Sequence, residues 1–273
     1  MQTITSALER VQQRVAALAP TDISTRLDRY QYRFDGNVAR VIPLGTDGQP
    51  LLLHDLALRQ LTSRIGVPID YLRRCPRSLA DLNVNYFIQE GSYKRESQFR
   101  TIRGNQVRAI LSESYAPFDD ADLFPLIAEA LGDDDVQVQL MDLSDHHSHF
   151  RILFPRLEIE AKPGDVIRAG IHISNSEVGL RGVIVESIAY RLVCTNGLVS
   201  PFRTSRISAR HVGNPNRLRE FVRTAVTEAK SNIPQLLDAY KATVHHRIEE
   251  PVKLIERTAN EGGLSQEQMR RIL

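Results

Sequence analysis

Several features that would assign a function directly are missing from this sequence of 273 residues. It has no Trp and only two Cys, at positions 75 and 194, which excludes a disulfide framework and a four-cysteine zinc site. No P-loop, GxGxxG, GxSxG or HExxH signature occurs, so the commonest nucleotide-binding, hydrolase and zinc-protease motifs are excluded as well. An enzymatic role therefore has no positive support from motifs.

Membrane and export signals are also lacking. No apolar run approaches the roughly 18 residues that a membrane span needs. The first 20 residues are amphipathic and do not have the charged, apolar and small-residue sections of a signal peptide. With only two cysteines, a reducing compartment fits, and we expect a cytoplasmic protein without a membrane partner.

The apolar pattern, in contrast, is strong, because 42% of the residues are hydrophobic and can form a sizeable core. Apolar residues at helical spacing predict helices over residues 3–18, 54–74 and 121–131, the second of them interrupted at Gly66-Val67-Pro68. Alternating β-branched residues predict strands within 27–53, at 84–91 and 97–112, and at 136–143, 148–160, 166–174 and 182–193. The fold class is thus α+β, with a largely antiparallel sheet, flanking helices and a helical C-terminal appendage.

The C-terminal part is predicted to be helical. Asn214-Pro215 supplies the N-cap and first-turn proline of a long helix, and further helices are expected from Pro251 and Ser265. No low-complexity linker, internal repeat or long charge block divides the chain. We therefore expect one domain, in which residues 1–213 form the α+β core with its N-terminal helix and residues 214–273 form the helical appendage.

Basic residues gather in two clusters, whereas acidic residues gather in 119–135. Because the net charge is only +2, any affinity for a polyanion depends on such local clustering. Guanidinium groups pair with phosphate and can stack on bases. The cationic residues that we expect to bind nucleic acid are Lys94, Arg95, Arg100, Arg103 and Arg108 in the predicted hairpin, and Arg191, Arg203, Arg206 and Arg210 in and after the last strands.

Aromatic residues are interleaved with the first basic cluster, namely Tyr86, Phe87, Tyr93 and Phe99. Charge for the backbone and ring faces for the bases are what a single-strand binding groove needs, so Tyr86 or Tyr93 is expected to stack on bases. The alternative is that alternating Arg residues mark the solvated face of a half-buried sheet, with Phe87 and Phe99 in the core. The sequence leaves both readings open.

The segment LSDHHSHF at 143–150 is the best candidate for a metal site. His147 and His149 lie on one face of an extended segment, and Asp142 and Asp145 are nearby as carboxylate donors. The ligand spacing matches no established motif, however, and polar turns collect such residues without binding a metal. We therefore expect no cofactor and assign no metal ligand.

A nucleophile could be supplied by Cys194, provided that His211 or His172 lies beside it as a base. A cysteine in a strand is, however, more often part of a core. No catalytic residue is assigned on this basis, and the sequence favours a protein that is not an enzyme.

Four stretches of the chain together resemble a known family: LTSRIGVPIDYL with CPRSLADLNVN, VRAILSESYAPFDDADL, ISNSEVGLRG and YRLVCTNGLV. The most specific pieces are RAILS at 108–112 with Tyr115, and Arg191 with CTNG at 194–197. In their order and spacing these stretches are similar to the phage/plasmid-like family found in bacteria, phages and plasmids. That family has no assigned activity, so the resemblance implies a mobile-element setting and a link to nucleic-acid metabolism without naming catalytic residues.

The polar residues of these stretches fall at predicted strand ends and turns. Asn196-Gly197, and Asn175 with Gly179, are typical of tight turns. The polar set could serve such turns alone, or it could line one cleft, because convergent polar groups mark binding sites. Its members are Arg108, Ser112, Tyr115, Asn175, Arg191 and Asn196.

These patterns favour a homo-oligomeric, ATP-independent protein that binds single-stranded DNA or RNA in recombination or annealing. One alternative is a metal-dependent enzyme that acts on nucleotides or nucleic acid through the polar cleft. Another is a protein-interaction module in phage or plasmid biology, whose amphipathic helices bind a protein partner.

Overall fold

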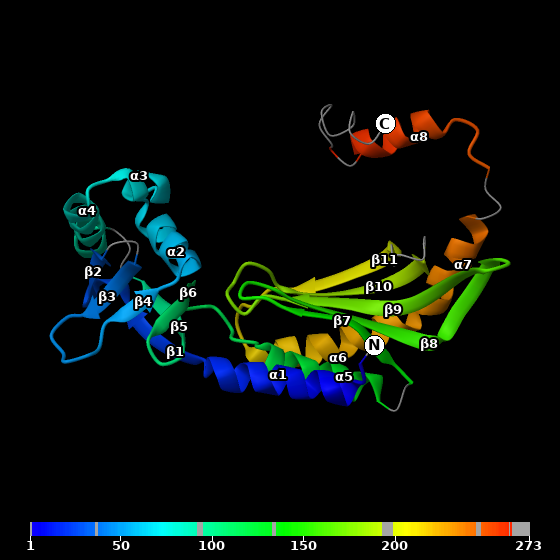
Figure 1. The fold of residues 1–273 in the computed structure, drawn as a ribbon, viewed down its shortest axis with the longest axis horizontal. Helices are drawn as coiled ribbons and strands as arrows, with labels where there is room; N and C mark the ends of the chain where they lie inside the picture. The colour runs from blue at the N-terminus through cyan, green and yellow to red at the C-terminus, as the bar shows by residue number, and fades with distance from the viewer. Residues whose placement is uncertain are drawn as a thin grey trace.

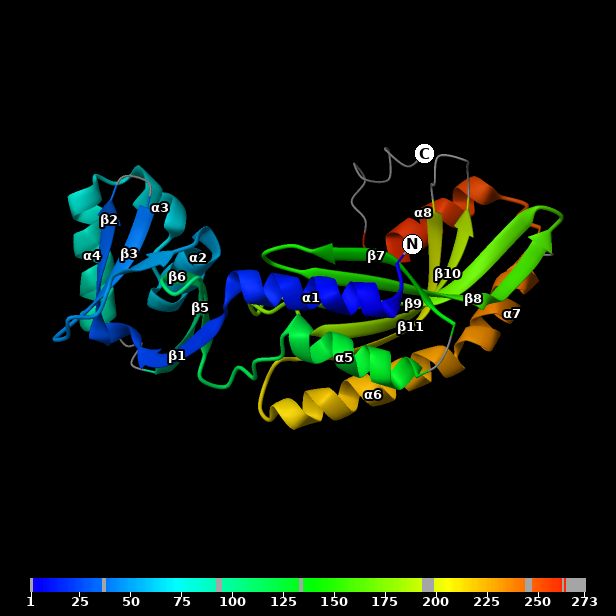
Figure 2. The same cartoon turned by 60° about the horizontal axis from the view of Figure 1, so that its bottom comes forward.

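The computed structural model describes residues 2–35, 38–91, 95–132, 135–192, 199–243, 247–261 and 263, without the side chains of 35, 161, 191–192 and 199–205. These residues form two lobes, each built on its own sheet, as Figures 1 and 2 show. Both sheets are largely antiparallel and carry helices, and the C-terminal region is helical. The α+β fold class predicted from the sequence is therefore confirmed.

The smaller lobe is a six-stranded sheet covered by three helices. Its sheet has the order β1-β5-β6-β4-β3-β2, in which only the short pair β4 and β6 is parallel. The elements are β1 Thr21–Arg26, η1 Leu27–Arg29, β2 Tyr30–Asp35, β3 Val38–Pro43, β4 Leu51–Leu53, α2 Asp55–Ile65, α3 Ile69–Arg74, α4 Arg77–Gln89, β5 Glu96–Ile102 and β6 Gln106–Ser112. Gly66, in the left-handed conformation, ends α2, and Pro68 starts α3, as the sequence predicted.

The larger lobe is an antiparallel five-stranded sheet in the order β11-β10-β9-β8-β7. Helices α1, α5, α6 and α7 lie along one face of this sheet, and α8 lies on the other side (Figures 1 and 2). The elements are α1 Ile4–Leu18, α5 Asp120–Leu131, β7 Gln137–Leu143, β8 Ser148–Lys162, β9 Asp165–Asn175, β10 Val183–Leu192, β11 Val199–Ala209, α6 Pro215–Ser231, α7 Ile233–Thr243 and α8 Pro251–Glu261.

In the sheet of the larger lobe, successive side chains point to opposite faces, as a two-faced sheet requires. Both faces carry buried residues, because Leu153, Ile188 and Tyr190 form a small cluster apart from the main core. On β8 the side chains of Phe150 and Ile152 enter the core beneath the helices, and Ile171 and Ile173 do so on β9. The residues between them point to the opposite side, which we call the open face. Because the period of side chains in a strand is two, this alternation fixes the pairing register across β8, β9 and β10.

The segment 84–91, expected to be a strand, is instead the second half of α4. Ala80, Val84 and Ile88 are all buried on one side of this helix, at the spacing of four residues that a helix uses. The β-branched and aromatic residues of VNYFI favoured a strand locally, and packing of the helical face against β2 overrides that preference.

The chain also divides differently from the expected core and appendage. Residues of α6 and α7, among them Val222, Val226 and Ile233, are fully buried in the core of the five-stranded sheet, so residues 215–243 are part of that core. The six-stranded sheet has a second core of its own. Asn214 caps α6 through its side chain and Pro215 begins it, as predicted, while the helix expected from Ser265 lies outside the described residues.

Among the helices that the structure describes, none is both long and apolar enough to cross a membrane.

Candidate functional site at the junction of the two lobes

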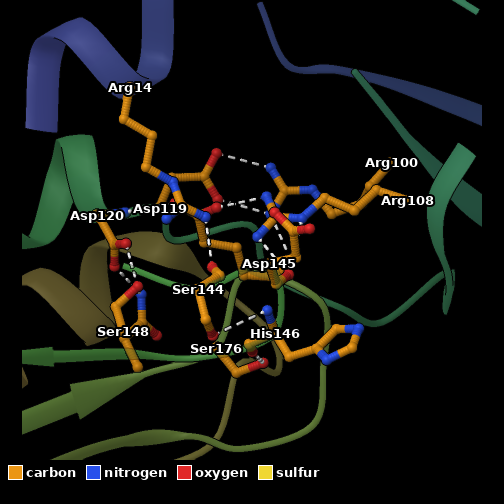
Figure 3. A network of polar contacts seen from close by, with 12 residues as sticks. Arg14, Arg100, Arg108, Asp119, Asp120, Ser144, Asp145, His146, Ser148 and Ser176 are labelled. Carbon is orange, nitrogen blue, oxygen red and sulfur yellow. Dashed lines mark hydrogen bonds and ion pairs between the residues drawn. The ribbon is translucent and has the colours of Figure 1, made fainter. Parts of the chain in front are cut away.

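Charged side chains from both lobes meet in one network where the lobes join (Figure 3). The smaller lobe contributes Arg100 from β5 and Arg108 from β6. The larger lobe contributes the start of α5 and the turn between β9 and β10, residues 176–182. A small apolar cluster that includes Leu111, Tyr115 and Val178 packs beside this network. The junction is therefore built from both lobes.

Arg100 joins three segments through its guanidinium group. Its Nε donates to Asp22 at 2.9 Å, its two terminal nitrogens donate to the carboxylate of Asp119 at 2.6 and 2.7 Å, and the Glu177 carbonyl accepts a further bond at 2.8 Å. Burial opposes the charge of Arg100, but the carboxylates of Asp119 and Asp22 outweigh it and raise its pKa. Asp119 is the N-cap residue of α5, and its carboxylate serves as the fork partner of this arginine.

Arg108 pairs with Glu177 in the buried part of the junction, with 2.6 Å between Nη1 and Oε2. The other nitrogens of Arg108 donate to the carbonyl of Asp145. The second oxygen of Glu177 accepts the backbone N–H of Asp120 at 3.0 Å, so this carboxylate also occupies the N-terminal end of α5. Burial alone would raise the pKa of Glu177, but the charge of Arg108 and this N–H bond outweigh burial and lower the pKa.

A second chain of contacts continues from Asp120 into the larger lobe. Its carboxylate accepts bonds from the hydroxyl of Ser148 and, at 3.0 Å, from the amide of Asn175, whose oxygen lies 2.9 Å from Nε2 of His211. Burial raises the pKa of Asp120 to about 7 and lowers that of His211 to about 4. The ring of His211 stacks on Tyr115, with 5.3 Å between the ring centroids.

A pocket of about 370 Å³ opens to solvent beside His211 and Tyr115. We call it the junction pocket; it is lined by Ser112, Tyr115, Gly179, Leu180, Arg181, Gly182, Arg210, His211 and Val212. The turn that carries Arg181 follows Asn175, which pairs with Ser148 at the start of β8, and the Ser176 hydroxyl of this turn donates to the His146 carbonyl. The junction pocket therefore lies at one end of the open face.

The open face carries a row of polar side chains in register across four strands. Arg151 lies opposite His172, His172 opposite Glu186, and Glu186 opposite Arg206. The guanidinium of Arg151 lies over the ring of Tyr190 at 4.6 Å, and the rings of His149 and His172 are stacked at 5.4 Å. Arginine and ring faces thus alternate on this surface. Arg206 lies on the edge strand β11, and Arg210 follows the end of this strand and lines the junction pocket.

The predicted basic hairpin does not form a cationic groove. The side chains of Arg100 and Arg108 are only 7% exposed and bind carboxylates, so the prediction that they neutralise phosphates is wrong. Arg95, Arg103 and Tyr86 are exposed, but Tyr86 lies on α4 and pairs edge-to-face with Phe87. Phe99 is in the core, as the alternative reading had it, but Phe87, which that reading also placed in the core, is 42% exposed. Tyr93 and Lys94 lie outside the described residues.

The second basic cluster is better placed for binding. Arg206 is exposed on the open face, where it also pairs with Glu186, and Arg210 is exposed in the junction pocket. Arg219 and Arg223 of α6 form ion pairs with Asp122 and Glu129 of α5. Arg191 and Arg203 lie in β10 and β11, opposite Ile167 and Ile188, but their side chains lie outside the described part.

The hypothesised metal site is not assembled. Among the described residues, no group of three or more His, Cys, Asp and Glu side chains could hold a metal ion. His149 stacks on His172, and the Asp145 carbonyl binds Arg108. Cys194 and Asn196 fall outside the described residues, so the nucleophile hypothesis and part of the predicted cleft lie there as well. The other described members of that cleft, Arg108, Ser112, Tyr115 and Asn175, do come together at the junction.

No family model, curated protein or solved structure matches the chain. Sequence reasoning missed Glu177, Asp120 and Arg181 as members of the site. Their signal was a run of polar residues, NSEVGLRG, placed directly after a strand of alternating apolar residues, where a solvated turn alone would not need buried charges.

Proposed function

We propose that the chain binds single-stranded nucleic acid, without ATP, and acts in recombination or annealing of the mobile-element type in the cytoplasm. The observation that carries the proposal is the continuous surface formed by the open face and the junction pocket. It holds exposed guanidinium groups at Arg168, Arg206, Arg181 and Arg210 beside the stacked imidazoles of His149 and His172. Arg168 and Arg206 are half-exposed or more but also form ion pairs with Glu158 and Glu186. Sequence-tolerant binders of single strands combine such charges with ring faces.

Three features support this choice of surface. The helices α1, α5, α6 and α7 cover the other face of the sheet, so the open face is free of them (Figure 2). A strand of nucleic acid needs a run of cations along its path, and the chain supplies Arg206 on β11 and Arg210 directly after this strand. The resemblance to the phage/plasmid-like family fits a role with nucleic acid.

Self-association is part of the proposal. α8 exposes the large apolar side chains of Val252, Leu254 and Ile255, and apolar surface of this kind is typical of contact sites. A homo-oligomer would place several open faces along one strand. The mass of the protein in solution, measured with and without Leu254→Glu and Ile255→Glu, checks this part separately.

Replacing Arg168 and Arg206 together by Ala should weaken binding to all single strands alike. Each lost phosphate contact lowers the slope of log affinity against log salt by about 0.7, so two contacts are worth ~25-fold at 0.1 M salt. Fluorescence anisotropy with labelled single-stranded and duplex DNA and RNA, titrated at several salt concentrations, measures both quantities.

The matched control is the double variant Arg10→Ala and Arg33→Ala, which removes the same charge from exposed positions on α1 and β2, away from the open face. It should bind like the wild type. An equal loss in both double variants, or a salt-independent affinity in the wild type, would contradict the assignment. A loss confined to Arg95→Ala with Arg103→Ala would move the interface to the smaller lobe.

A further inference from the structure

The two arginines of the junction pocket are available to a ligand. Arg181 and Arg210 are exposed, and within the described part of the chain neither has a hydrogen bond or an ion pair to a carboxylate. This distinguishes them from Arg100 and Arg108, which are paired with the carboxylates of Asp22, Asp119 and Glu177. Two guanidinium groups that line one pocket and have no carboxylate partner are suited to a doubly charged anion.

The walls of the junction pocket are held rigidly. The turn that carries Arg181 is fixed at its start by Glu177, which binds Arg108 and the Asp120 N–H, and by the Ser176 hydroxyl, which donates to the His146 carbonyl at 2.7 Å. At its end, Gly182 runs so close to β11 that an added Cβ would lie 2.1 Å from the Ala209 oxygen. A site ordered before binding loses less entropy when its ligand arrives.

The pocket also offers more than charge. Ser112 adds a hydroxyl, which lies 3.1 Å from that of Ser114, and the stacked pair of Tyr115 and His211 borders the pocket. The exposed apolar side chains of Leu180 and Val212 line it as well. A volume of about 370 Å³ is at the small end of the range for organic ligands, which suits one nucleotide.

We propose that the junction pocket binds a nucleotide through a terminal phosphate, that is, a phosphomonoester clamped between Arg181 and Arg210. The same chemistry is present at the phosphorylated end of a strand and in a free nucleoside monophosphate. The strand-end form rests on the proposed function, because the open face leads directly to the pocket. The free-nucleotide form does not.

The test compares oligonucleotides that are identical except for a 5′-phosphate, a 3′-phosphate or hydroxyl ends. A phosphorylated end should bind about tenfold tighter than the hydroxyl end, since charge-assisted hydrogen bonds to a dianion are strong. Arg181→Ala and Arg210→Ala should each remove most of this preference. Arg217→Ala, an exposed arginine on α6 outside the pocket, should retain it. Calorimetric titration with adenosine 5′-monophosphate forms the second arm.

The outcomes separate this inference from the proposed function. A phosphate preference that disappears in the two pocket variants supports the strand end as ligand. Binding of adenosine 5′-monophosphate that needs both arginines, without end preference, supports the free nucleotide. Strand binding that ignores the phosphate, together with no binding of the monophosphate, overturns the pocket while leaving the open face standing. Unchanged melting temperatures of the exposed-residue variants exclude misfolding as the cause.

Discussion

Arg108→Ala should lower the free energy of unfolding by about 3–5 kcal/mol, because it leaves the carboxylate of Glu177 buried without its partner. The pair is only 7% and 9% exposed at the two side chains, so water cannot replace the lost guanidinium. Arg108 also satisfies the Asp145 carbonyl, which would lose both of its bonds from this side chain. Urea unfolding followed by circular dichroism measures the change.

The control is Arg95→Ala, which truncates an exposed arginine next to the same hairpin and should change stability by no more than about 0.5 kcal/mol. The double variant Arg108→Ala with Glu177→Ala should recover part of the loss, since neither charge is then left unpaired. A cost below about 1 kcal/mol in the single variant would show that the junction is open to water in solution.

The burial of Arg100 and Arg108 could not be predicted from the local sequence pattern. Arginines at alternating positions of a hairpin are typical of a solvated face when one side of a sheet is covered. In this chain nearly every residue of β5 and β6 is buried, because α2 and α4 belong to the core on one side and the turn at 176–182 of the larger lobe packs on the other. No local pattern reveals that a distant segment brings Glu177 and Asp119 to these guanidinium groups.

Elements with strong local signals were predicted well. Pro68 and Pro215 mark helix starts, Gly66 ends α2, and Gly104, with φ of +80°, forms the turn of the β5–β6 hairpin. These residues act through backbone conformation, which neighbours in the sequence determine. The helix α4 was missed because its residues are buried through packing against the sheet, which local residue preferences do not show. The sequence signal for this helix is the spacing of four residues between its buried apolar positions.

The candidate site was predicted in outline and not in chemistry. The sequence grouped Arg108, Ser112, Tyr115 and Asn175 as one polar set, and the fold brings them together. It did not show which charges would neutralise one another. Within the described residues, Arg181 and Arg210 have no carboxylate partner, whereas Arg100 is paired with carboxylates. This difference depends on which acidic residues the larger lobe places near each arginine.

Asp120 and His211 should give opposite pH dependences of stability. For Asp120, burial raises the pKa from 3.8 to about 7, so the folded protein holds this proton more tightly than the unfolded chain. Its stabilising contribution is complete below about pH 4 and is lost as the pH rises to about 7. For His211, burial lowers the pKa from 6.5 to about 4, so its contribution is complete above pH 6.5 and is lost as the pH falls to about 4.

Relative to the wild type, Asp120→Asn should therefore gain about 4 kcal/mol between pH 4 and pH 7, and His211→Gln should lose about 3 kcal/mol between pH 4 and pH 6.5. Asp47→Asn, at an exposed turn, should follow the wild-type curve. Unfolding in urea at six or more pH values measures these differences. Two difference curves of the same sign, or flat curves for both buried variants, would refute the assignment. Opposite slopes would show that Asn175 joins a protonated carboxyl group to a neutral imidazole. In the wild type, the stability lost at one of these two residues as the pH changes is then largely offset by the stability gained at the other. The junction therefore stays closed across this pH range.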